Sequence, residues 1–130
     1  LNIHTQDISD LTPLRGLTSL IELRLAANSF TDLSPLRGLN TLQFLELTGN
    51  NISDITPLSG LTNLMQLDLR FNPELSNIQA LFENPGIGAG DIVELRHTNV
   101  SCTDQALLAE KGVEVRTELF SSCATATRQR

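Results

Sequence analysis

The sequence predicts a solenoid, in which short coils stack on one another and bury a shared apolar interior. The first observation is a fixed step between equivalent positions, which is the same from Asn28 to Asn50 as from Asn50 to Asn72 and holds for leucine, aspartate, proline and glycine as well. The second is the composition: 40% of the 130 residues are hydrophobic but only 4% are aromatic, so leucine must supply most of the core. A unit as short as the stretch from Asn28 to Asn50 cannot bury its apolar side alone, and its neighbours must therefore cover it.

Each unit contains an alternating L-x-L segment, seen as "LRL", "LEL" and "LDL". Alternation of apolar and polar residues predicts a short strand whose two leucines point inward and whose flanking residues point outward. The inward pairs are Leu23 and Leu25, Leu45 and Leu47, and Leu67 and Leu69. Stacking of identical units makes these strands neighbours in a parallel sheet.

An asparagine follows each strand at the same distance, at Asn28, Asn50 and Asn72. The chain must turn off the strand here, and turning leaves backbone groups without partners. A side-chain amide both donates and accepts hydrogen bonds, so it can serve the backbone of its own coil and of the adjacent coil. We therefore expect these residues to form a structural asparagine ladder.

The segment D-[LI]-[TS]-P-L completes each unit and begins at Asp10, Asp32 and Asp54. Its aspartate, hydroxyl residue and proline suit a tight turn or a single 3₁₀ turn. A row of aspartates could suggest a calcium site, but a turn-initiating aspartate in every repeat explains the row better.

Both ends of the chain depart from the pattern. The chain opens inside a strand, at Leu1 and Ile3, and Gln6 stands where asparagine is expected. We predict a single domain of residues 1–130, divided into regular repeats (1–81), a glycine-rich insertion (82–91), C-terminal capping repeats (92–123) and a tail (124–130). The first strand exposes leucines and backbone, so upstream repeats or end-to-end contact with a second chain should cover it.

The capping region contains two further strand patterns, "VELR" and "VEVR". The first starts at Val93, a longer step after Leu67 than in the regular repeats, and we predict that the second starts at Val113, a shorter step later. The intervening "TDQALLAEKG" predicts a short α-helix with Thr103 or Ser101 as its N-cap and Gly112 just past its end.

The pattern L-x-x-L-x-L-x-x-N-x-I-x-D-I-x-P-L-x-x-L resembles a leucine-rich repeat of the 22-residue class. That class occurs in bacterial internalin-like surface proteins and in a eukaryotic phosphatase-regulating subunit. The resemblance is close from Leu1 to about Leu81 and looser as far as Val115. It implies an α/β solenoid: a right-handed coil with a short-stranded parallel sheet on its concave face, and turns, 3₁₀ segments and one short helix on its convex face.

The two cysteines, Cys102 and Cys123, occupy nearly the same place on successive coils. Adjacent strands lie about 4.8 Å apart, which is compatible with the roughly 4.4–6.8 Å Cα separation of a disulfide. We predict a disulfide, which would imply an oxidising compartment; two reduced, half-buried thiols are the alternative. Leucine-rich-repeat proteins outside the cell often close their ends with a bridge, so the resemblance points the same way.

The side chains that flank the inward leucines should line the concave face. We predict an acidic column there (Glu46, Asp68, Glu94 and Glu114) and a basic column beside it (Arg70, Arg96 and Arg116). Aromatic and arginine residues dominate interface energetics, so Phe44 is the first candidate for partner binding. The other candidates are Arg24, Glu46, Gln66, Asp68, Arg70, Glu94 and Arg96.

Two questions stay open on this face. One is whether the charges only pair with each other and keep a leucine shell soluble, because exposed pairs contribute about 0–1 kcal/mol each. The other concerns Phe71, at a strand exit, which either extends the partner-binding patch or packs in the core under the turn.

Several classes of site are not expected. A net charge of −6 argues against nucleic acid, and no apolar run approaches the roughly 20 residues that span a bilayer. His4 and His97 lie four coils apart, about 19 Å at the usual strand spacing, and cannot share a metal. A disulfide at Cys102 would remove the thiolate that a Cys102–His97 nucleophile pair requires. We expect that the protein binds no metal and no cofactor and is not an enzyme.

The sequence therefore favours a non-catalytic protein-binding module, part of a larger secreted or cell-surface bacterial protein, that meets its partner on the concave face. Its expected location is extracellular, at the cell surface or periplasmic. An intracellular regulatory or scaffold subunit of an enzyme is one alternative. A structural spacer with no partner is another.

Overall fold

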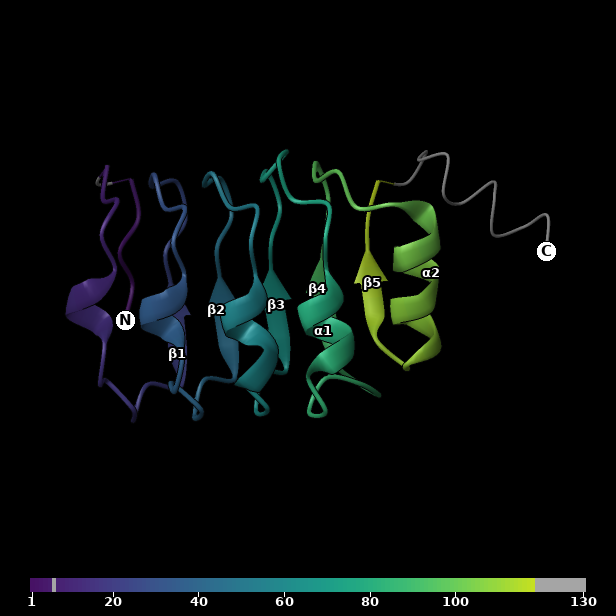
Figure 1. Cartoon of the computed structure of the whole chain (residues 1–130), viewed down its shortest axis with the longest axis horizontal. Coiled ribbons are helices and arrows are strands. Elements are labelled where there is room, and N and C mark those ends of the chain that lie inside the picture. Colours follow the sequence, from purple (N-terminus) through teal and green to yellow (C-terminus); the bar gives the residue numbers. More distant parts are fainter. Residues whose placement is uncertain (6, 119–130) are drawn as a thin grey trace.

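The computed structural model describes residues 1–5 and 7–118. A five-stranded parallel sheet runs the length of the molecule, and its strands are paired in chain order (Figure 1). Each strand is short: β1 (Glu22–Arg24), β2 (Phe44–Glu46), β3 (Gln66–Asp68), β4 (Ile92–Glu94) and β5 (Glu114–Arg116). Residues around Leu1 contribute an isolated bridge, in which Asn2 pairs with Arg24. The predicted solenoid and its parallel sheet are confirmed.

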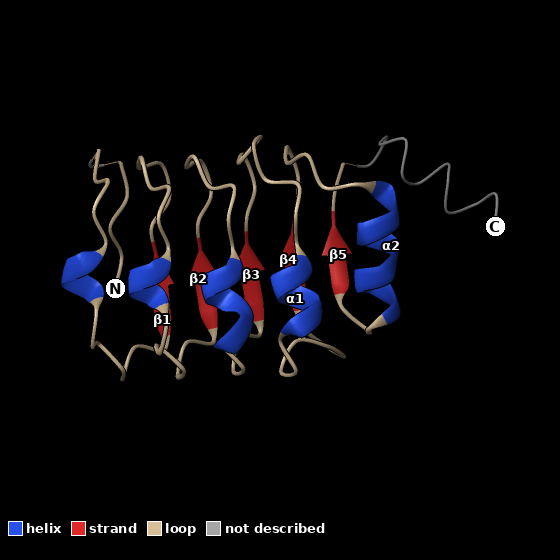
Figure 2. Ribbon diagram, in the orientation of Figure 1, coloured by secondary structure: helices blue, strands red, loops and turns tan. Residues whose placement is uncertain are grey.

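Helical turns lie on the side opposite the sheet, so each coil from β1 to β4 has a strand on one face and a helical turn on the other (Figure 2). They are η1 (Thr12–Leu14), η2 (Ser34–Leu36), η3 (Thr56–Gly60), α1 (Gln79–Glu83) and α2 (Cys102–Glu110). The three η elements are 3₁₀ turns with proline in their first turn, as the D-[LI]-[TS]-P-L pattern predicts. The helix α1 spans the boundary expected between residues 81 and 82.

The aspartate of each repeat begins its turn, as predicted. Each carboxylate accepts a bond of 2.9 Å from the amide two positions ahead, in Asp10, Asp32 and Asp54 alike. Hydrogen bonds from Thr12, Ser34 and Thr56 lower the pKa of these carboxyls, because they favour the charged form. The row of aspartates therefore has a local structural explanation.

The inward leucines form one continuous core between the sheet and the turns. Both leucines of each L-x-L segment are at most 1% exposed, and Phe30 is fully buried among them. Burying a side chain of this size stabilises the fold by roughly 1.5–3 kcal/mol. The layers are nearly identical from coil to coil, so the same interaction recurs along the whole molecule.

The pairing of the last strand differs from the prediction. The step from β3 to β4 is the expected long one, with Leu67 opposite Val93. Val93, however, pairs with Val115 and not with Val113, so the last step is the same as in the regular repeats. In the sequence V-E-V, moving the register from one valine to the other leaves the alternation unchanged, and the pattern alone cannot choose between them. Val113 instead lies before the strand, with its side chain in the core.

The glycine-rich segment after α1 is fastened to the neighbouring coils. Asn84 is fully buried and donates to the carbonyls of Leu58 and Leu61, both at 3.0 Å. Gly86 passes so close to the preceding coil that a Cβ atom would lie 1.9 Å from the carbonyl oxygen of Thr62. The Lys111 ammonium donates to the carbonyls at the end of α1, the closest being that of Leu81 at 3.0 Å.

The predicted C-terminal helix is confirmed as α2. Ser101 is its N-cap, and the Ser101 hydroxyl accepts a 3.1 Å bond from the amide of Asp104. Gly112 follows the helix with φ +90°, the left-handed conformation that glycine adopts at no steric cost. Cys102 begins this helix, but Cys123 lies outside the described residues, as does Gln6. The disulfide therefore stays a prediction.

Candidate protein-binding surface

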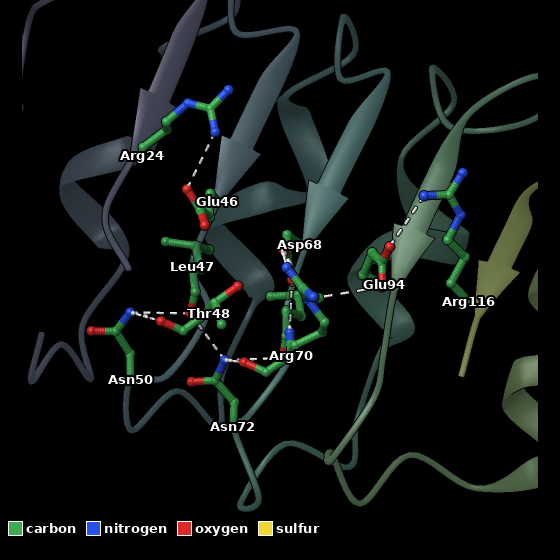
Figure 3. A network of polar contacts seen from close by, with 11 residues as sticks. Arg24, Glu46, Leu47, Thr48, Asn50, Asp68, Arg70, Asn72, Glu94 and Arg116 are labelled. Atoms are coloured by element: carbon green, nitrogen blue, oxygen red, sulfur yellow. Dashed lines mark hydrogen bonds and ion pairs between the residues drawn. The ribbon is translucent and has the colours of Figure 1, made fainter. Parts of the chain in front are cut away.

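The asparagine ladder lies at the strand exits and joins neighbouring coils. The Asn50 amide donates 3.0 Å bonds to the carbonyls of Leu25 on the previous coil and Leu47 on its own coil. Its oxygen accepts a bond from the amide of Phe30. Asn72 repeats this arrangement one coil later, donating to Leu47 and Leu69 (Figure 3).

The ladder is continuous because the Leu25 and Leu47 carbonyls each accept bonds from two asparagines. Asn28 and Asn50 both donate to the Leu25 carbonyl, and Asn50 and Asn72 both donate to the Leu47 carbonyl. These groups are buried, where a polar group without a partner is costly. The chain of shared acceptors ties each strand exit to the next and fixes the position of the strands above it.

The side chains that flank the inward leucines form the sheet face, which is the predicted concave face. Strand pairing arranges them in rows. The first row is Glu22, Phe44, Gln66, Ile92 and Glu114; the second is Arg24, Glu46, Asp68, Glu94 and Arg116; Arg70 and Arg96 follow the second row at the exits of β3 and β4. The predicted basic column of Arg70, Arg96 and Arg116 is thus wrong, because the corrected register places Arg116 opposite Glu94. The predicted acidic column is wrong at its end as well, because Glu114 lies opposite Ile92 and not beside Glu94.

The charges of the second row pair with one another and with Arg70 (Figure 3). Glu94 lies between two guanidinium groups, 3.8 Å from Arg70 Nε and 3.3 Å from Arg116 Nη1. Arg70 Nη2 also bonds to Asp68 Oδ2 at 2.6 Å. Arg24 Nη1 lies 3.7 Å from Glu46 Oε2. Acidic and basic side chains therefore neutralise one another along the sheet.

Asp68 and Glu94 are nearly covered by their partners, with side chains 7% and 9% exposed. Burial alone would raise the pKa of Asp68, but the hydrogen bonds from the side chain and backbone of Arg70 outweigh burial and lower that pKa. The same bond raises the pKa of Arg70. Both groups remain charged at neutral pH, so the network persists under physiological conditions.

Phe44 lies half-buried in the first row and is covered on one side. The Arg24 guanidinium carbon sits 4.4 Å from the centre of the Phe44 ring, in cation–π contact. Arg24 also bonds to Glu22 at 2.6 Å. The first candidate for partner binding is therefore in contact with one of the other candidates.

Phe71 is 51% exposed, so the alternative in which it packs in the core is wrong. Its ring stacks on the ring of His97, with centroids 4.4 Å apart and planes 23° from parallel. From the sequence, His97 is a candidate only for a metal ligand or a base. The two rings could have been related from the sequence, because the step from Phe71 to His97 equals the step from Leu67 to Val93, which are paired between β3 and β4.

Other kinds of site receive no support from the described residues. Across residues 1–5 and 7–118, no three or more His, Cys, Asp and Glu side chains are gathered so that they could hold a metal ion. None of the helices described has the length and apolar character to cross a bilayer. The sheet face is the candidate functional surface, with the charge network, Phe44 and Gln66 on it.

Comparison with known proteins places this architecture. The family described as Leucine Rich repeats (2 copies) matches residues 40–83. This chain is 32% identical in sequence to internalin C2 from Listeria monocytogenes. The crystal structure of internalin C2 gives a TM-score of 0.74, and the match covers 91% of this chain and 50% of that one. Internalin InlF from the same organism is 29% identical, with a TM-score of 0.74 over 93% of this chain and 36% of that one. No curated relative matches by sequence.

Proposed function

Because the chain is an internalin-like leucine-rich-repeat protein that spans half the length of internalin C2 and less of InlF, we propose that it is a non-catalytic module that binds another protein through its sheet face. The main observation in favour of the proposal is that the strands of this face are held in fixed positions. The strands are tied together at their exits by shared asparagine bonds. A partner therefore meets side chains whose backbone is already ordered, and binding loses little conformational entropy.

Photo-crosslinking at two glutamines tests the face used. Gln66 is half-buried in the first row of the sheet face, whereas Gln79 is exposed at the start of α1 on the opposite side. Each is replaced in turn by a photo-reactive amino acid, and both variants are exposed to proteins of the native source. The proposal expects one specific product from position 66 and none of it from position 79. The same product from position 79 alone would overturn the choice of face.

The spacer alternative has a specific observation in its favour, since the charges of the second row and Arg70 already form ion pairs with one another. A spacer would give no specific product from either position. The proposal adds that the first row remains available through the half-buried Gln66 and the part of Phe44 that Arg24 does not cover, while the second row and Arg70 hold their own charges.

We further propose that the module works outside the cell, at the cell surface or in the periplasm. The similarity to internalins supports this location, as would the predicted Cys102–Cys123 disulfide. Titration of the denatured, unreduced protein with a thiol reagent tests it. The proposal expects no reactive thiol. Two reactive thiols would contradict it and favour the intracellular regulatory alternative.

A further inference from the structure

The strand exits contain a recurrent left-handed position. One residue on each coil adopts a φ between 54° and 69° there, immediately before the ladder position or its equivalent. These residues are Ala27, Gly49, Phe71 and His97, with Thr5 on the first coil. Glycine adopts this conformation at no steric cost, whereas a bulky side chain is strained. The turn therefore explains the backbone conformation but not the presence of two rings in succession.

The two rings do not belong to the core. Phe71 is 51% exposed, and the side chain of His97 is 57% exposed, although each covers one face of the other. His97 is further held by Glu118, which accepts a bond from the His97 amide. Gly49 serves the same turn one coil earlier without steric strain, and strained positions concentrate at functional sites, so the two exposed and stacked rings are candidates for a binding role.

A cationic residue borders the rings through its backbone. The Phe71 amide donates a 3.0 Å bond to the carbonyl of Arg96, and His97 follows Arg96 in the chain, so a long side chain at position 96 starts beside both rings. The Arg96 side chain is exposed and makes no ion pair or hydrogen bond with any described residue, unlike Arg24, Arg70 and Arg116. This surface therefore presents two stacked rings, the Arg96 guanidinium without an ion pair to any described residue, and the Glu118 carboxylate, whose Oε1 lies 3.6 Å from His97 Nδ1.

We propose that Phe71, Arg96 and His97, here named the exit patch, bind an extended partner segment that carries a large aromatic side chain next to a carboxylate. The inference deepens the proposed function and rests on it. An aromatic ring of the partner extends the Phe71–His97 stack in offset or edge-to-face geometry. The neighbouring carboxylate accepts two parallel hydrogen bonds from the Arg96 guanidinium. Glu118 already lies beside His97, so Arg96 is the charged group of this surface without an ion pair among the described residues, and it favours a carboxylate over an ammonium group next to the partner's ring.

The composition of the protein provides a clean assay, because the chain contains neither Trp nor Tyr. A synthetic probe peptide, acetyl-Gly-Ser-Trp-Asp-Gly-Ser-amide, is titrated with the protein while its Trp emission is followed. The proposal expects a saturable change that weakens as salt concentration rises. Peptides with Ala in place of Trp, labelled at one end and followed by anisotropy, or with Lys in place of Asp, should bind about tenfold more weakly.

Variants of the protein localise the binding. Phe71→Gly removes the ring and relieves the strained backbone, so it should fold at least as well as the parent while binding the Trp-Asp peptide about tenfold more weakly. Arg96→Gln should weaken binding severalfold and remove most of the salt dependence. Met65→Ala, which removes the most exposed of the large apolar side chains described, should leave binding unchanged.

Two results would overturn the exit patch: no saturable signal with the unmodified protein, or equal binding by the parent and Phe71→Gly. Neither bears on the broader proposal. A product cross-linked through Gln66, combined with a failed peptide titration, would leave the sheet face as the binding surface and remove the exit patch from it.

Discussion

The asparagine ladder makes a quantitative prediction about stability. Asn50 is 4% exposed, and its side chain bonds to the Leu25 and Leu47 carbonyls and to the Phe30 amide. Replacing it with alanine leaves the Phe30 amide buried without its partner. Each carbonyl keeps the bond from its other asparagine, so the carbonyls lose part of their hydrogen bonding and not all of it.

The expected cost follows from these groups. A buried donor without a partner costs about 1–3 kcal/mol, and each lost hydrogen bond contributes about 0.5–1.5 kcal/mol. We expect Asn50→Ala to lower the free energy of unfolding by roughly 3 kcal/mol. The adjacent Asn51 is exposed, and its side chain makes no hydrogen bond within the described part of the chain. Asn51→Ala should therefore change the free energy by less than about 0.5 kcal/mol.

Urea unfolding followed by far-ultraviolet circular dichroism is the assay, since the protein lacks Trp and Tyr. The free energy is obtained by linear extrapolation to zero denaturant. A difference below about 1 kcal/mol between Asn50→Ala and Asn51→Ala would refute the reasoning. The Leu47 carbonyl provides a second check, because it loses both of its donors only in the Asn50→Ala, Asn72→Ala double variant. The double variant should lose about 1 kcal/mol more free energy of unfolding than the two single variants lose together.

Three further predictions concern other parts of the chain. Gly86→Ala should lower the free energy of unfolding by roughly 1–3 kcal/mol, because its Cβ would meet the backbone of Thr62. Gly60→Ala is the control, because no atom lies within 4 Å of its Cβ. It should be neutral or slightly stabilising in the same urea assay. Lys111→Met should lower stability by about 1 kcal/mol, because the carbonyls at the end of α1 lose a charged donor; an unchanged melting temperature would contradict this role. Asp68→Asn should destabilise the protein at pH 7. Because the folded-state pKa of Asp68 is below the ordinary 3.8, its contribution is complete above pH 3.8 and disappears as pH falls through the lower value, so a deficit that is the same at low pH would refute the assignment.

Much of the fold could be predicted because it repeats. Equivalent residues recur at a fixed step, so one correct assignment of strand, asparagine and turn applies to several coils at once. Where the repeat ends, the prediction depended on local alternation alone. The alternation in Val113–Glu114–Val115 fits two registers equally well, one with Val113 and one with Val115 opposite Val93. The structure has Val115 there, so the predicted register is wrong. The helix α1 was missed for the same reason, because it occurs where the regular pattern stops.

Less of the candidate surface could be predicted, because long side chains choose their partners in three dimensions. The sequence places acidic and basic residues on the same face, but only the register shows that Arg116 serves Glu94. Nothing in the spacing indicates that Arg24 covers Phe44. The exposure of Phe71 follows from a left-handed backbone position, and no pattern of apolar residues reports that conformation.

Recognition of a partner on the sheet face is the claim on which the proposed function depends most directly. The decisive measurement is the affinity of the cross-linked partner, by isothermal titration calorimetry, for Gln66→Arg and Gln79→Arg, which make the same change on opposite sides of the coil. We predict that Gln66→Arg weakens binding by at least about tenfold, or 1.4 kcal/mol, while Gln79→Arg changes it less than about twofold. Loss of binding by Gln79→Arg, with Gln66→Arg unaffected, would contradict recognition on this face.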